Sequence, residues 1–84
     1  MKEKILKYVI RITQIILNDD SITEDTKLLE LGMFDSIDII TLISEIESEY
    51  SIELTEEDFD LENFQTPKSI TEMISKQISI NGRE

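Results

Sequence analysis

Few side chains in this sequence are suited to chemistry. The 84 residues include no cysteine and no histidine, so the chain lacks a thiol nucleophile, a Ser-His triad and the most common general base. A Gly-rich phosphate-binding loop is also missing. Carboxylates remain, but a domain of this size has little room for an enclosed cleft around them. We therefore expect no enzymatic activity from this chain itself.

One serine is set apart by its surroundings. Residues 32–38 read GMFDSID, which places Ser36 after a predicted glycine turn at Gly32 and at the start of a helix. Asp35 is a good N-cap, and Asp38 occupies the capping-box position three residues later. Ser36 is therefore expected at the surface, beside the backbone amides and the positive end of the helix dipole. As a bare pattern, the same residues also describe ordinary helix capping.

Helical periodicity predicts the elements that position this serine. Apolar residues recur at helical spacing in residues 3–18, 36–50 and 68–79. A cap at Thr66 with Pro67 starts the last helix, and Asn81-Gly82 ends it. The expected inner stripes are Ile5, Val9, Ile12 and Ile16; Ile39, Leu42 or Ile43, Ile46 and Tyr50; and Ile70, Met73, Ile74 and Ile78. The expected solvent stripe of the first helix is Lys4, Lys7, Arg11, Gln14 and Asn18.

Two connections complete the predicted fold. Residues 19–34 form a long loop, and Thr55 caps a short helix. The loop is expected to reach the core through Ile22, Leu28, Leu29, Leu31 and Phe34, and the short helix through Phe59, Leu61 and Phe64. We therefore predict one domain over residues 1–84. Its fold class is all-α, a four-helix bundle of three main helices and one short helix, with a long first loop.

The charge is strongly acidic and unevenly distributed. Acids outnumber bases 19 to 8, for a net charge of −11, and residues 19–64 hold sixteen acids against Lys27 alone. This charge argues against nucleic acid and anionic membranes as partners, and it favours basic protein surfaces and a monomer. Lys7, Arg11 and Gln14 interrupt any signal-peptide core, and no apolar run could span a membrane, so we expect a cytoplasmic protein. A solvated face is the alternative reading of the charge run.

A calcium loop is the one metal site that the spacing suggests. Twelve residues run from Asp19 to Glu30 between two predicted helices, as in an EF-hand loop. The ligands would be Asp19, Ser21, Thr23, Asp25 and Glu30. However, Glu24 occupies the sixth position, where the sharp turn favours glycine. We therefore predict no metal site and keep the calcium loop only as an alternative to test.

The whole pattern resembles acyl carrier proteins. The Asp-Ser-Leu motif of that family appears as Asp35-Ser36-Ile37, and an acidic helix follows it. Chain length, net charge and helix order also fit, so the resemblance covers essentially the whole chain. It implies that Ser36 receives 4′-phosphopantetheine from coenzyme A, and that acyl groups are carried as thioesters on the thiol of this arm. The arm would supply the thiol that a chain without cysteine lacks.

The resemblance also implies partners and a docking element. The partners would be a phosphopantetheinyl transferase, an acyl- or aminoacyl-activating enzyme, and a downstream transferase or synthase. Exposed charge pairs suit a protein that must bind several enzymes and leave each of them. The docking element would be the helix over residues 36–50. Its candidate contacts are Asp35, Ile37, Asp38, Glu45, Glu47 and Glu49. For Ile37, a place in the core is an equal alternative.

Departures from the fatty-acid pattern bear on the cargo. Two residues separate Gly32 from Asp35, where fatty-acid carriers typically have one, and residues 58–67 form a longer stretch than theirs. These features look more like stand-alone carriers of polyketide or nonribosomal peptide pathways and D-alanine carriers of teichoic acid modification. We therefore expect a specialised biosynthetic pathway, with D-alanylation or fatty-acid synthesis as alternatives. An unmodified acidic module that binds a basic partner is the alternative of another class.

Overall fold

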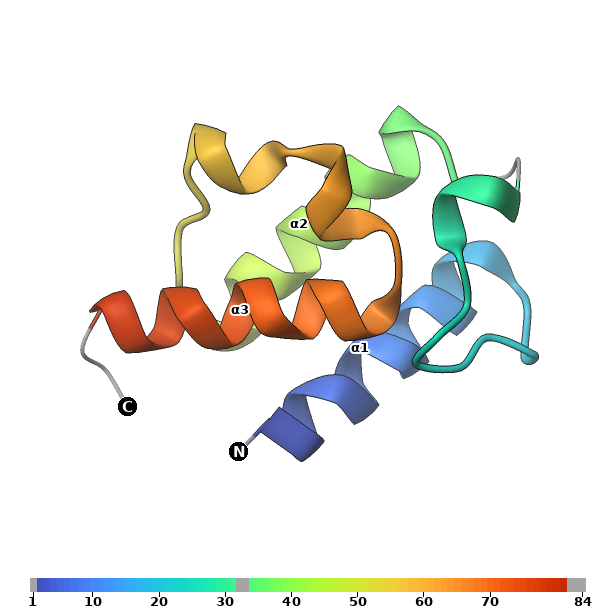
Figure 1. The fold of residues 1–84 in the computed structure, drawn as a ribbon, viewed down its shortest axis with the longest axis horizontal. Coiled ribbons are helices and arrows are strands. Elements are labelled where there is room, and N and C mark those ends of the chain that lie inside the picture. Colours follow the sequence, from blue (N-terminus) through green and yellow to red (C-terminus); the bar gives the residue numbers. More distant parts are fainter. Residues whose placement is uncertain (1, 32–33, 82–84) are drawn as a thin grey trace.

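The computed structural model describes residues 2–31 and 34–81, and every regular element in these ranges is helical. Three α-helices form the body (Figure 1). The elements, in chain order, are α1 (Lys2–Leu17), η1 (Leu28–Leu31), α2 (Ser36–Tyr50), η2 (Glu56–Phe59), η3 (Leu61–Phe64) and α3 (Pro67–Asn81), where η marks a single 3₁₀ turn. The predicted all-α fold with three main helices is confirmed. The predicted short helix is instead a pair of 3₁₀ turns.

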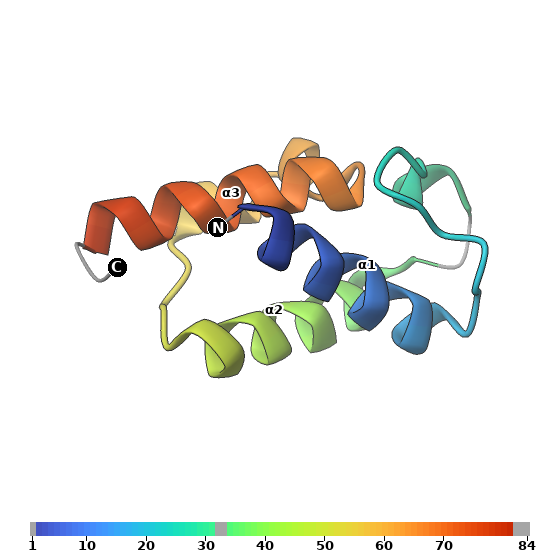
Figure 2. The ribbon, with the colours of Figure 1, turned by 90° about the horizontal axis from the view of Figure 1, so that it is seen from below.

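The first helix holds the bundle together. α1 packs against both α2 and α3, and η3 packs against α3 (Figure 2). Large aliphatic side chains fill the space between them, and this apolar burial is the main favourable term in the folding of so small a domain. The fully buried apolar side chains include Ile5, Val9, Ile22, Leu28, Leu42, Ile46, Phe64, Ile70 and Ile74.

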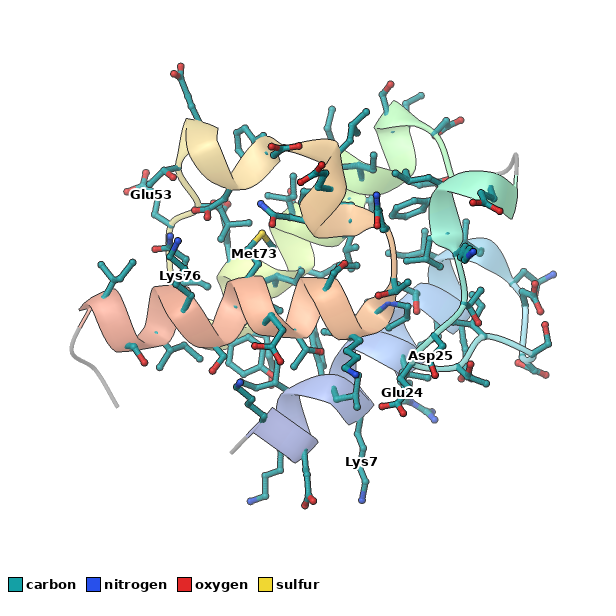
Figure 3. The ribbon with its side chains drawn as sticks, in the orientation of Figure 1. Lys7, Glu24, Asp25, Glu53, Met73 and Lys76 are labelled. Carbon is teal, nitrogen blue, oxygen red and sulfur yellow. The ribbon has the colours of Figure 1, made fainter. Side chains whose placement is uncertain are left out.

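The innermost line of α1 differs in part from the predicted stripe. Thr13 is fully buried, whereas Ile12 and Ile16 are only partly buried at the edge of the core. Burial of a hydroxyl is tolerated because Thr13 Oγ1 donates to the backbone carbonyl of Val9 at 2.8 Å or of Ile10 at 2.9 Å. The predicted solvent stripe holds at Lys7, which points away from the body (Figure 3).

The long loop is held against the helices by buried side chains and by backbone hydrogen bonds. Ile22, Leu28 and Phe34 are buried, as predicted, and Leu29 is partly buried. The backbone N–H of Leu28 donates to the carbonyl of Gln65 at 2.7 Å, and that of Lys68 to the carbonyl of Glu24 at 3.1 Å. The loop is therefore tied to the start of α3. The side chain of the predicted anchor Leu31 and the predicted turn at Gly32 lie outside the part of the chain that the structure describes.

The predicted start of α3 is confirmed. The Ser69 amide donates to Oγ1 of Thr66 at 3.0 Å, and the Thr66 amide donates to Oγ of Ser69 at 3.1 Å. This reciprocal pair satisfies two donors at the helix start, and Pro67 takes the first helical position, where no donor is needed. The helix continues through Asn81, two residues beyond the predicted end. The predicted stop at Gly82 lies outside the described residues.

Candidate functional site

Ser36 is the first residue of α2, and its side chain is exposed. Asp35 caps this helix with extended backbone angles, and its Oδ1 accepts a hydrogen bond from the Asp38 amide at 3.0 Å. In return, the Asp35 amide donates to Oδ2 of Asp38 at 3.4 Å. The predicted capping box is therefore confirmed. It fixes where α2 begins and so holds the serine hydroxyl beside the free amides of the first turn.

The segment before Ser36 is anchored in the hydrophobic core. Phe34 is buried in the core, and Ile39 packs against the same cluster from the first turns of α2. These two residues occupy the positions of a hydrophobic staple, which fixes the angle at which a chain enters a helix. Burial of one such side chain stabilises a fold by about 1.5–3 kcal/mol. Ser36 is thus an exposed hydroxyl on a well-supported backbone.

An apolar groove opens directly beside Ser36. It runs between α2 and the η2–η3 segment and has a volume of about 480 Å³. Its lining residues are Ser36, Ile39, Ile40, Ile43, Ser44, Phe59 and Leu61. Isoleucine side chains form the α2 wall, and the phenyl ring of Phe59 with the side chain of Leu61 forms the other. The serine hydroxyl therefore lies at the edge of an open hydrophobic surface.

The position of Phe59 and Leu61 corrects the sequence prediction. Both were expected to pack inward, yet they are 48% and 58% exposed, and only Phe64 is buried as predicted. The inward position in η2 is taken by Asp58, whose carboxylate accepts hydrogen bonds from Thr55 and Gln77. The extended backbone of Asp60 then interrupts the two turns, so the helical register is reset before η3. Both apolar side chains consequently face the groove.

Apart from Ser36, the groove residues were not predicted as functional. Ile40 is 62% exposed and, like Phe59 and Leu61, was absent from the predicted site. One sequence signal existed: Ile37 and Ile40 are apolar but lie outside the inner stripe of α2. A surplus of apolar residues on the outer face of a helix indicates a surface that something else covers.

The predicted docking residues on α2 differ in their surroundings. Ile37 is 72% exposed, which decides against a place in the core. Asp35, Glu45 and Glu49 are exposed, and Asp38 is half-buried within the capping box. Glu47 is half-buried, and its Oε2 accepts a hydrogen bond from the Leu54 amide at 2.9 Å. Its carboxylate therefore fastens the chain after α2.

Two tyrosines join α1 to the end of α2. The Tyr8 hydroxyl donates to the backbone carbonyl of Glu45 at 3.2 Å. The rings of Tyr8 and Tyr50 pack edge to face, with 5.5 Å between their centroids. Burial, followed by the nearby charges of Glu45 and Glu49, raises the pKa of Tyr8 to about 12. Burial also raises the pKa of Tyr50, with a smaller effect of Glu49. Both phenols are neutral at physiological pH and act in packing.

In the candidate calcium loop, the carboxylate of the first candidate ligand, Asp19, is engaged in hydrogen bonds within the loop. Oδ1 of Asp19 accepts hydrogen bonds from the Ser21 hydroxyl at 2.6 Å and from the Ser21 amide at 2.9 Å. These two bonds lower the pKa of Asp19 below its ordinary value. Within residues 2–31 and 34–81, no three His, Cys, Asp or Glu side chains come together in a group that could hold a metal ion. No helix in the same ranges has the length and apolar character needed to cross a bilayer.

Comparison with known proteins places this geometry in context. Residues 3–74 match the family described as "Phosphopantetheine attachment site". The chain is 37% identical over 76 residues to an acyl carrier protein of Buchnera aphidicola subsp. Baizongia pistaciae, covering 90% of this chain and 94% of the relative. It is 34% identical over 68 residues to a D-alanyl carrier protein of Enterococcus faecalis, covering 79% and 87%. A D-alanyl carrier protein of Staphylococcus xylosus is 36% identical over 52 residues, covering 62% and 67%.

Proposed function

Because the chain belongs to the phosphopantetheine attachment-site family, we propose that it carries acyl or aminoacyl groups as thioesters on a 4′-phosphopantetheine arm attached to Ser36. The observation that supports this attachment point is the exposed Ser36 hydroxyl at the capped start of α2. The arm supplies a thiol, which this chain cannot provide because it has no cysteine. The protein itself performs no catalysis in this proposal.

The residues around Ser36 fit such a group. Its loading forms a bond between Oγ of Ser36 and the pantetheine-bearing phosphorus of coenzyme A, and breaks the bond to the adenosine bisphosphate half. The hydroxyl proton passes to a base of the transferase. The product is a phosphodiester, whose negative charge is favoured near the amides and dipole of a helix N-terminus. Asp35 and Asp38 bond to each other's backbone amides in the capping box, while their charges favour an outward direction for the phosphodiester.

The acidic surface of α2 suits the partners of a carrier. We propose that Asp35, Ile37, Asp38, Glu45, Glu47 and Glu49 contact the phosphopantetheinyl transferase, an activating enzyme, and a downstream transferase or synthase. Exposed carboxylates raise the rate of encounter with basic enzymes without slowing release. The hydrogen bond from Leu54 to Glu47 makes that residue the least available of the six. Coenzyme A is a cytoplasmic metabolite, which supports a cytoplasmic location.

The cargo belongs to a specialised pathway in this proposal. Two of the relatives described above are named D-alanyl carrier proteins, and one is named acyl carrier protein. The longer stretch before α3 also favours a dedicated acyl or aminoacyl pathway over fatty-acid synthesis. Loading of the purified holo-protein with D-alanine by an adenylating ligase, compared with loading by a malonyl or acyl transferase, separates these alternatives.

Intact mass spectrometry tests the attachment site. The unmodified protein is incubated with coenzyme A, Mg²⁺ and a phosphopantetheinyl transferase, and a gain of one phosphopantetheine is expected. Ser36→Ala abolishes the gain, whereas Ser44→Ala, which alters another serine of the same groove, leaves it intact. No gain in the native protein, or a full gain in Ser36→Ala, contradicts the proposal. Partner binding that survives Ser36→Ala without any modification indicates an interaction module instead.

A further inference from the structure

One face of α1 carries the opposite charge from the rest of the protein. Lys4, Lys7 and Arg11 are exposed and follow one another at spacings of three and four residues, so they lie on one side of the helix. Ile15, four residues after Arg11, is 62% exposed and continues the same line. We call these four residues the basic face. It holds three of the eight Lys and Arg residues in a chain whose net charge is −11.

The bases of this face do not stabilise the fold through ion pairs. Within residues 2–31 and 34–81, the one salt bridge joins Lys2 to Glu72 at 2.9 Å. Lys4, Lys7 and Arg11 therefore form no salt bridge with the described residues, although the chain contains 19 acids. Their positive charges remain open to a partner.

The position of these bases along α1 also opposes the helix dipole. A cation is favoured at the C-terminal end of a helix, whereas the N-terminal end favours an anion, by about 0.3–1 kcal/mol for each charge. Lys4 lies in the first turn of α1 and Lys7 in the second, but the last turn contains no base. The sequence thus keeps unpaired positive charge at the end of the helix where it reduces stability. A conflict of this kind between local stability and sequence is typical of a functional surface.

The basic face lies on the side of the molecule away from the groove beside Ser36. In Figure 1, α1 runs along the lower side of the body, whereas η2 and η3 lie along its upper side. Lys7 extends downward from α1, out of the body (Figure 3). A partner bound at the basic face therefore leaves Ser36 and the η2–η3 segment accessible.

We infer that the basic face binds an acidic segment of another protein, whose carboxylates meet Lys4, Lys7 and Arg11 and whose apolar side chain covers Ile15. Lys4 and Ile15 are separated by eleven residues, or about 16 Å of helix, so a partner helix of about three turns spans the face. Such binding holds the protein in place while Ser36 stays free for loading and unloading. This tethering role rests on the proposed function, whereas the binding itself depends only on α1.

Two other occupants fit the basic face less well. Lipid-binding clusters contain about four to eight bases, and this face has three. A membrane is also a wide anionic plane, which repels the sixteen acids of residues 19–64, whereas an acidic protein segment matches α1 alone. A second copy of the chain offers acids of its own, but each copy has a net charge of −11, and the two repel each other.

The experiment titrates the unmodified, isotope-labelled full chain with a synthetic helical peptide of about sixteen residues. One face of the peptide carries three glutamates and one leucine at helical spacing, and a scrambled peptide of the same composition is the control. We expect amide chemical shifts to change along α1 and not along α2, with the native peptide order alone. Added sodium chloride should weaken this binding, because salt screens charge pairs between exposed groups.

Matched variants separate the basic face from the overall charge. Lys7→Glu and Lys76→Glu change the net charge equally, and both lysines are exposed on α-helices, but Lys76 lies on α3. We expect Kd for the peptide to rise by about five- to thirty-fold in Lys7→Glu and by less than about twofold in Lys76→Glu. Ile15→Gln should also raise Kd, whereas Ile80→Gln, at a 64% exposed position of α3, should not. The melting temperature of Lys7→Glu should not fall, because an acid near the start of α1 suits the helix dipole.

Equal weakening by Lys7→Glu and Lys76→Glu would overturn the inference, because net charge alone would then explain the binding. Tighter binding to phosphatidylglycerol vesicles than to the peptide, lost in Lys7→Glu, would overturn the choice of a protein partner. Dimers of the native protein that Lys7→Glu abolishes would do the same. The tethering role predicts that saturating peptide leaves the rate of Ser36 modification by a phosphopantetheinyl transferase unchanged, and a large fall would refute it. Failure of Ser36 to be modified without peptide would contradict the proposed function instead.

Discussion

The side chains of Asp58 and Gln77 meet inside the protein, where Oδ2 of Asp58 accepts a hydrogen bond from Nε2 of Gln77 at 2.8 Å. The same oxygen accepts from the Thr55 amide at 2.8 Å and from the Thr55 hydroxyl at 3.0 Å. Because Asp58 belongs to η2 and Gln77 to α3, this contact connects one wall of the groove to the third helix. Met73 points from α3 toward the same 3₁₀ segment (Figure 3).

Removal of this carboxylate is expected to destabilise the protein. Asp58→Ala deprives three donors of their charged acceptor, and hydrogen bonds to charged groups contribute about 1.5–3 kcal/mol each when buried. We expect the free energy of unfolding in urea to fall by about 2–3 kcal/mol. Glu62→Ala is the control, because Glu62 is an exposed acid of the next turn, and it should change the value by less than about 0.5 kcal/mol. Equal stability of the two variants would argue against the role given to Asp58.

Tyr8 should reduce stability at alkaline pH. Its pKa is raised from 10.0 to about 12 in the folded protein, so the unfolded chain loses the phenolic proton first as pH rises. The contribution of Tyr8 to the free energy of unfolding is therefore complete below pH 10 and is lost progressively as pH rises toward 12. We expect the free energy of unfolding to fall in this window, and the fall to shrink in Tyr8→Phe. The phenolate absorbance of Tyr50→Phe isolates the titration of Tyr8, and a midpoint near 10.0 would contradict the prediction.

Gln14 holds the long loop against α1. It was predicted to face solvent, but its Nε2 donates to the carbonyls of Asp20 at 3.3 Å and Ile22 at 3.0 Å. Gln14→Ala should lower the free energy of unfolding by about 1 kcal/mol and speed amide exchange in residues 20–27. Arg11→Ala, at an exposed position of the same helix, serves as control. Unchanged exchange in the loop of Gln14→Ala would refute this role.

Ser51 is expected to accept glycine with a gain in stability. It ends α2 in the left-handed region, at φ 53° and ψ 45°, where a residue with a side chain is disfavoured by about 1 kcal/mol. Ser51→Gly relieves this strain, so we expect a rise of about 0.5–1 kcal/mol in the free energy of unfolding. Ser48→Gly, in the exposed interior of the same helix, should instead lower it by about 0.5–1 kcal/mol. A loss of stability in both variants would contradict the prediction.

Sequence patterns predicted α2 and the exposed position of Ser36 at its start, because the causes of both are local. A cap at Asp35, its partner Asp38 and a regular inner stripe determine where the helix begins and which face is buried. Thr13 and Asp58 were missed for the opposite reason. Asp58 is buried against Gln77 of α3, which only the folded chain brings near. Thr13 finds its acceptor within α1, but its burial depends on how α1 packs against the other helices. Since Asp58 takes the inward position, the outward position of Phe59 could not be predicted either.

The backbone bonds between the long loop and the start of α3 have a consequence for the motions of the protein. Leu28 is bonded to Gln65, and Glu24 to Lys68, so the residues that precede Ser36 and those that follow η3 are joined at one place. If these two hydrogen bonds broke together, the segment that precedes Ser36 and the segment that follows η3 would be released in a single cooperative step. Amide protons of Leu28 and Lys68 should then exchange with solvent at matching rates, faster than those of Ile46 in the core.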